Sequence, residues 1–238
     1  MFISLLVLSC NKTDNSLNDR QGSSVSTKLN DKPSLQIVCL QDESGSSSRN
    51  FVGTILDNNI DAIVERLLQS GGEFDFGIIS DSHKDQLRRL SIPPIPKKKV
   101  FHRSGNPLID ERNFRDYKDY EKKFDSSMYV LKQSINIKVE VFKKELHDLQ
   151  KRPLSTRTDF NSAFTRAETS LSEINDLHNK VLLIISDCEE NMNLRSIPEG
   201  LNAKLIIVNP FPPSIAKQYN AICFEGINAA IKYIVKSY

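Results

Sequence analysis

The stretch that decides the fold class is Val181–Ser186, which reads VLLIIS. A short run that is apolar at almost every position is typical of a strand buried on both faces of a parallel sheet. The run Leu35–Leu40 (LQIVCL) has the same character. Three more short runs are predicted strands for the same reason: Phe74–Ser80, Leu205–Val208 and Ala221–Phe224.

Helical patterns alternate with these strands along the chain. They cover residues 51–68, Phe160–His178, Ser214–Tyr219 and Gly226–Tyr238. This alternation predicts an α/β fold: a Rossmann-like, doubly wound, mostly parallel sheet with helices on both faces. We also expect an extra edge strand at Val100–Arg103, after a proline-rich loop.

One long segment, residues 110–152, contains neither Gly nor Pro and interrupts the alternation. Apolar residues recur in it at seven-residue spacing, at Phe114, Met128, Ile135, Phe142 and Leu149. This stripe predicts a helical insertion. A single helix of some 40 residues would be about 60 Å long, longer than the domain, so we favour two helices folded onto the sheet. One projecting helix that docks a partner is the alternative.

The N-terminus has the pattern of a targeting segment. Phe2–Ser9 (FISLLVLS) is almost entirely apolar, Cys10 follows, and residues 11–34 are polar. An apolar segment this short is a secretion signal and not a membrane span. Ser9-Cys10 after Val7-Leu8 resembles the lipobox of bacterial lipoproteins, although Met1-Phe2 carries no Lys or Arg. We therefore expect three parts: a signal peptide (1–10) ending at a lipidated Cys10, a flexible tether (11–34), and one domain (35–238) anchored by lipid to a membrane of the bacterial cell envelope.

Composition narrows the function classes. The chain has 238 residues, a net charge of +2 and 4 cysteines. Near-balanced charge argues against nucleic acid as a partner. Four cysteines are too few for a disulfide scaffold, and they lack the paired spacing of a zinc site. Whether any of Cys39, Cys188 and Cys223 form a disulfide stays open. The basic run Lys97–Lys99 is interpreted as a solvated loop, with a membrane-surface contact as the alternative.

Oxygen-bearing side chains follow the predicted strands. In the loop Gln41–Ser46, alternate residues of an extended chain point the same way, which brings Asp42, Ser44 and Ser46 together. Ligands of parallel sheets bind at the carboxyl ends of the strands, where Thr158 adds a hydroxyl and Asp187 a second carboxylate. These hard donors suit Mg²⁺, with Mn²⁺ or Ca²⁺ as alternatives. Neutral hydroxyl ligands leave cation charge uncompensated, so an outside carboxylate can complete such a site.

The arrangement resembles the von Willebrand factor A-type domain and its metal-ion-dependent adhesion site. The family has a D-x-S-x-S motif after the first strand, a Thr before a helix, and an Asp at the end of a later strand. Asp42–Ser46, Thr158–Phe164 and Ile184–Asp187 are similar to these three elements. The resemblance implies a Rossmann-like sheet and metal-dependent protein binding. Arg157 and Cys188 depart from the glycines usual at those places, Thr156 competes with Thr158, and Asp81 competes with Asp187.

These observations favour a membrane-anchored, divalent-cation-dependent adhesion or interaction domain over an enzyme. Its partner would be a protein that presents an acidic residue. The alternative is a metal-assisted hydrolase or phosphatase that uses the same oxygens. Glu43 or His83 would have to be its general base, and the sequence shows no nucleophile–base pair.

Overall fold

The computed structural model describes residues 33–45, 53–80, 86–155, 158–173, 179–188, 201–210, 217 and 219–238. The described residues form a six-stranded sheet in the order β3-β2-β1-β4-β5-β6. Its strands are β1 (Leu35–Asp42), β2 (Gly72–Ile79), β3 (Arg88–Ile92), β4 (Asn179–Ile185), β5 (Lys204–Val208) and β6 (Ile222–Phe224). Every neighbouring pair is parallel except β2 and β3. The parallel strands therefore all end at one edge of the sheet, which we call the carboxyl edge.

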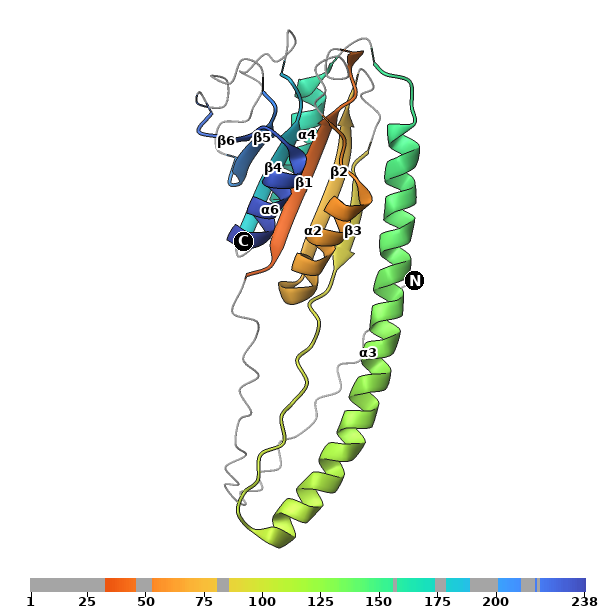
Figure 1. Cartoon of the computed structure of the whole chain (residues 1–238), viewed down its shortest axis with the longest axis vertical. Coiled ribbons are helices and arrows are strands. Elements are labelled where there is room, and N and C mark those ends of the chain that lie inside the picture. The colour runs from red at the N-terminus through yellow and green to blue at the C-terminus, as the bar shows by residue number, and fades with distance from the viewer. Residues whose placement is uncertain are drawn as a thin grey trace, which may run out of the picture.

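Helices cover both faces of the sheet (Figure 1). Helices α2 (Asp57–Ser70) and α6 (Ile227–Ser237) pack on one face together with the end of α3 (Pro107–Gln150), and α4 (Phe160–Glu173) packs on the other. Strand β1 shows why: Ile37 and Cys39 contribute to the first core, while Val38 and Leu40 contribute to the second. Alternate side chains of a central strand point to opposite faces, so both faces need a helical layer. The predicted fold class is confirmed.

The predicted pair of helices at 110–152 is wrong, because α3 is one continuous helix of 44 residues. Only its second half packs on the sheet, through Ile135, Val139, Phe142, Leu146 and Leu149. The first half projects beyond the sheet, and residues 93–106 run beside it (Figure 1). The ring of Phe101 lies 5.4 Å from that of Phe114 and 5.6 Å from that of Tyr117. We call residues 93–134 the stalk.

The five strands predicted from apolar runs are all present, with small shifts at their ends. The sixth was missed: β3 begins Arg88-Arg89, and an edge strand of this polarity gives no apolar run. The edge strand expected at Val100–Arg103 is wrong, because that segment is irregular and packs on the first half of α3. Most of the helix predicted at Ser214–Tyr219 lies outside the described residues.

The predicted signal peptide, Cys10 and most of the tether also lie outside the described residues. Within the part of the chain that the structure describes, no helix combines the length and apolar character of a membrane span.

Candidate functional site

The two predicted carboxylates lie at the ends of neighbouring strands. Asp42 is the last residue of β1, and Asp187 follows β4 by two residues. Asp42 Oδ1 accepts a hydrogen bond from the Ser44 backbone N–H (2.9 Å), and Oδ2 accepts one from Ser186 Oγ (2.7 Å). The exposed fractions of Asp42 and Asp187 are 7% and 1%. The carboxyl edge thus holds two buried carboxylates, linked by the serine that precedes the second one.

Sequence reasoning missed Ser186. Its hydroxyl donates to Asp42 and accepts from the Cys188 backbone N–H (2.9 Å), so it fixes both the end of β1 and the turn after β4. A signal was present: the parallel register pairs Gln41 with Ile185, which places the following residues Asp42 and Ser186 side by side. Cys188 has a φ of 55°, in the left-handed region that favours glycine. This conformation accounts for the glycine expected there from the family resemblance.

The loop that carries Thr158 crosses the ends of two strands. The Ser155 N–H donates to the Glu43 carbonyl (2.9 Å), and the Asp159 N–H donates to the Ser80 carbonyl (3.2 Å). Ser44 and Ser155 also form a parallel bridge. The half-buried Thr158 lies between these anchor points in the chain, so its loop is fastened to the carboxyl edge.

Asp159 begins helix α4 as its N-terminal cap. Its Oδ1 accepts a hydrogen bond from the Ser162 N–H (3.0 Å), and its Oδ2 accepts one from the Ser162 hydroxyl (2.7 Å). A carboxylate in this position satisfies backbone N–H groups that have no partner within the helix. The cap defines where α4 starts, directly after Thr158.

Several predicted or competing residues lie outside the described residues: Ser46, Thr156, Arg157, Asp81 and His83. The complete ligand set is therefore still a prediction. Among the residues that the structure describes, no group of three or more His, Cys, Asp or Glu side chains could hold a metal. The predicted site is of a different kind, with two carboxylates and several hydroxyls, and an oxygen-only donor set of this kind fits a hard divalent cation.

Glu43 adds to the negative charge of this edge. Burial raises the pKa of its carboxyl, a hydrogen bond from the Gln41 amide lowers it, and the neighbouring Asp42 raises it again. Gln41 is held in turn, because its Oε1 accepts from the Ile55 N–H (3.0 Å). Crowded carboxyl groups raise one another's pKa, and a nearby cation has the opposite effect. The carboxyl of Glu43 therefore lies close enough to Asp42 for the two groups to interact electrostatically.

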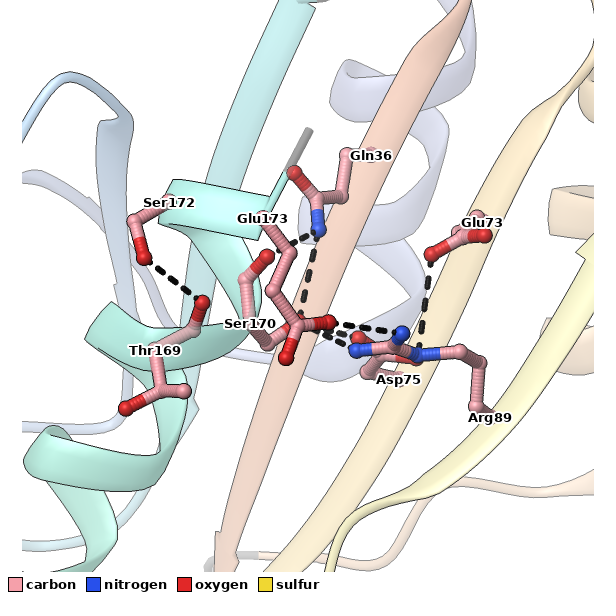
Figure 2. A network of polar contacts seen from close by, with 8 residues as sticks. All are labelled: Gln36, Glu73, Asp75, Arg89, Thr169, Ser170, Ser172 and Glu173. Carbon is pink, nitrogen blue, oxygen red and sulfur yellow. Dashed lines mark hydrogen bonds and ion pairs between the residues drawn. The ribbon is translucent and has the colours of Figure 1, made fainter. Parts of the chain in front are cut away.

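A second group of polar side chains lies between α4 and the sheet, nearer the amino ends of β1 and β2 (Figure 2). We call Gln36, Asp75, Arg89 and Ser170 the polar cluster. Arg89 Nε lies 3.1 Å from Asp75 Oδ1, and Ser170 Oγ donates to Asp75 Oδ2. Gln36 Nε2 donates to the Ser170 carbonyl (2.9 Å). Three strands and α4 meet in this cluster, which gives it a structural role.

Comparison with known proteins finds likenesses among solved structures alone. No family model and no curated protein matches the chain. The manganese-loaded TRAP protein of Plasmodium vivax is similar over 86% of this chain and 63% of its own, with 14% identity and a TM-score of 0.37. The pilus adhesin SpaC of Lactobacillus rhamnosus GG, in its open conformation, is similar over 66% of this chain and 15% of its own, with 12% identity and a TM-score of 0.29.

The chain spans less than two thirds of either structure, and at these scores the likeness carries no argument about function. The assignment of the fold therefore depends on the chain's own topology. It has a central β1, parallel neighbours on both sides, an antiparallel edge strand, and the three motif loops at one edge. The fold is von Willebrand factor A-like. The family resemblance inferred from the motifs is thus confirmed for the architecture of the domain.

Proposed function

We propose that this von Willebrand factor A-like domain is a cation-dependent protein-binding module, held by a lipid on Cys10 to a membrane of the bacterial cell envelope. The cation would be Mg²⁺, with Mn²⁺ or Ca²⁺ as alternatives. Its ligands would be Asp42, Ser44, Ser46, Thr158 and Asp187. The partner would be a protein that presents an acidic side chain.

The observation that supports this proposal is the convergence at the carboxyl edge. Asp42 is tied through Ser186 to the turn that carries Asp187, and the loop of Thr158 is hydrogen-bonded to Glu43. A bound Mg²⁺ brings positive charge to the site, and the ion keeps part of its water shell. The hydroxyl ligands are neutral and add no negative charge, so a carboxylate from outside can replace one of the waters that the ion keeps.

Titration calorimetry with Mg²⁺ tests the site directly. We expect the wild-type chain to take up the metal and Asp42→Ala to lose it. Asp116→Ala is the matched control, because it removes an exposed carboxyl of the stalk, which is far from the predicted ligand set. Asp187→Asn is a second variant that keeps the size of the side chain and guards against misfolding. Equal uptake by the wild type and both Asp variants would show that the site is misassigned.

Partner binding is tested by a pull-down from native envelope fractions with and without chelator. Capture that is lost in chelator and in Asp42→Ala supports the proposal, and capture indifferent to both contradicts it. The hydrolase alternative is tested in parallel with p-nitrophenyl phosphate. Hydrolysis that requires metal and disappears in Asp187→Ala would replace the binding function with catalysis.

A further inference from the structure

The far end of the stalk holds aliphatic side chains in water. Leu108 and Ile109, in the first turn of α3, have exposed fractions of 81% and 50%. Large exposed aliphatic side chains that cluster at the end of a projecting element mark a contact surface. We call residues 103–112 the stalk tip.

The stalk tip is an ordered cap. Asn106 Oδ1 accepts a hydrogen bond from the Leu108 N–H (3.2 Å), and Pro107 occupies the first turn of α3. The carboxylate of Asp110 accepts from the backbone N–H groups of Ser104 (2.6 Å) and Gly105 (3.2 Å). Asp110 therefore closes the turn that precedes the helix. The two aliphatic side chains are held outward by a defined conformation.

Two exposed arginines, Arg103 and Arg112, flank these aliphatic residues in the sequence, and Arg103 is close enough to the Asp110 carboxyl to lower its pKa. Of the two acidic residues at the tip, Asp110 is engaged by the cap and Glu111 pairs with Arg115 (2.5 Å). Guanidinium groups bind phosphate through paired hydrogen bonds. Aliphatic side chains beside phosphate-binding cations match the chemistry of a phospholipid surface, where the acyl boundary lies just beneath the phosphates.

The stalk tip and the carboxyl edge are at opposite ends of the molecule. Strand β1 enters the sheet at Leu35, at the end from which the stalk projects, and runs toward the carboxyl edge (Figure 1). Helix α3 runs the same way, since Ser155, just after its end, bonds to Glu43. A tether attached ahead of β1 therefore leaves the domain on the side of the stalk tip.

The lengths of the tether and the stalk agree with contact at the bilayer. The tether that the sequence predicts for residues 11–34 would, as a random coil, span roughly 25–30 Å on average. The projecting half of α3, residues 107–134, is roughly 40 Å long at the usual rise per residue. Because the stalk is longer than the average reach of the tether, the stalk tip is the part of an anchored domain that meets the bilayer first.

We infer that the stalk tip docks on a phospholipid bilayer, with Leu108 and Ile109 in the interface and Arg103 and Arg112 on lipid phosphates. This inference rests on the lipid anchor of the proposed function for its geometry. The docked stalk would hold the carboxyl edge away from the membrane, facing a partner.

The chain has no Trp, so a single introduced Trp reports on its own position. The test uses the full chain with Cys10→Ser, which removes any lipid, and vesicles of phosphatidylcholine and phosphatidylglycerol. We expect Leu108→Trp emission to shift to the blue with vesicles and to be quenched by brominated lipids. Val130→Trp is the matched control, since Val130 lies on the same helix and is 65% exposed. Arg103→Glu with Arg112→Glu should lower vesicle partitioning at least about tenfold, because each basic residue near an anionic surface contributes about fivefold.

An unchanged emission of Leu108→Trp with vesicles would overturn the inference, and so would an equal shift of Val130→Trp. Labelling of wild type and Cys10→Ser with radioactive palmitate tests the anchor separately, because the vesicle experiment contains no lipidated protein. A chelator should leave vesicle binding intact while it abolishes partner capture. Failure at the bilayer is therefore distinguishable from failure of the metal site.

Discussion

Replacing Arg89 by Met is the sharpest probe of how the sheet holds α4. Arg89 comes from the edge strand β3 and pairs with Asp75 of β2 (3.1 Å) and with Glu173 of α4 (2.8 Å) (Figure 2). The side chain of Asp75 has no exposed surface, and its second oxygen accepts from Ser170 Oγ. Met fills a similar volume and removes only the charge and the donors. Arg89→Met therefore leaves a buried carboxylate without its cationic partner.

The size of the effect follows from burial. Breaking a buried ion pair from one side costs about 3–5 kcal/mol of folding free energy. Because the side chain of Arg89 is 41% exposed, water already screens part of the pair, and we expect about 2 kcal/mol at neutral pH. For a domain of this size, that loss lowers the melting temperature by roughly 4–8 °C.

The loss should depend on pH. Burial raises the pKa of the Asp75 carboxyl, whereas the contacts with Ser170 and Arg89 lower it. A carboxyl whose pKa is higher in the folded state stabilises the fold when protonated, and this contribution disappears as the pH rises through the folded pKa. Without Arg89 the folded pKa rises further. The deficit of Arg89→Met is therefore greatest at neutral pH and shrinks as the pH falls toward the ordinary value for Asp, about 3.9.

Urea unfolding of four chains between pH 7 and pH 4 measures this: wild type, Arg89→Met, Asp75→Asn and the double variant. Asn removes the charge that needs a partner, so we expect the double variant to be more stable than Arg89→Met alone. A deficit of Arg89→Met that stays constant with pH would refute the reasoning. A double variant no more stable than Arg89→Met would refute it as well.

Two further substitutions test how the sheet is built. Gly72 has a φ of 144°, and a Cβ there would lie 1.9 Å from the Leu35 carbonyl oxygen, so Gly72→Ala should lose at least about 2 kcal/mol in urea unfolding. Gly105 has a φ of 88° and no atom near the position of an added Cβ, so Gly105→Ala measures the backbone strain alone and should lose about 1 kcal/mol. Equal losses for Gly72→Ala and Gly105→Ala would show that the contact of the Gly72 Cβ with β1 is unimportant. Phe142 is buried with its ring 5.4 Å from Phe74, so Phe142→Ala should cost about 3–5 kcal/mol by thermal unfolding. Phe124 lies in the stalk, so Phe124→Ala should leave the free energy of global unfolding nearly unchanged and should speed amide exchange in the stalk. A loss of unfolding free energy as large as that of Phe142→Ala would contradict the separation of stalk and core.

The central strands could be predicted because burial on two faces leaves an unmistakable apolar run. Strands β1 and β4 are buried along nearly their whole length, and each was found within two residues at either end. Strand β3 could not be found in the same way. Its Arg89 points into the polar cluster, which forms only when α4 and β2 come together. These segments are far apart in the chain, so no local sequence pattern predicts the contact between them.

The site was predictable in part for a related reason. Residues that follow predicted parallel strands share an edge by topology, so Asp42 and Asp187 could be placed together before any contact was known. Ser186 was overlooked because it looks like the polar end of an apolar strand. Its role depends on the register between β1 and β4, which strand prediction alone does not give.

The stalk shows why the preference for two helices failed. That preference assumed that an apolar stripe over the whole of α3 must be buried against the sheet, which a straight helix of this length cannot do. The first half of the stripe is instead partly covered by residues 93–106, where Phe101 packs on Phe114 and Tyr117. Lys98 fastens the same segment to Glu121 (2.9 Å) and Asp125 (3.1 Å). Because an irregular segment can partly cover a helical stripe, and residues 110–152 contain neither Gly nor Pro, α3 continues without a break and carries its first turn far from the sheet.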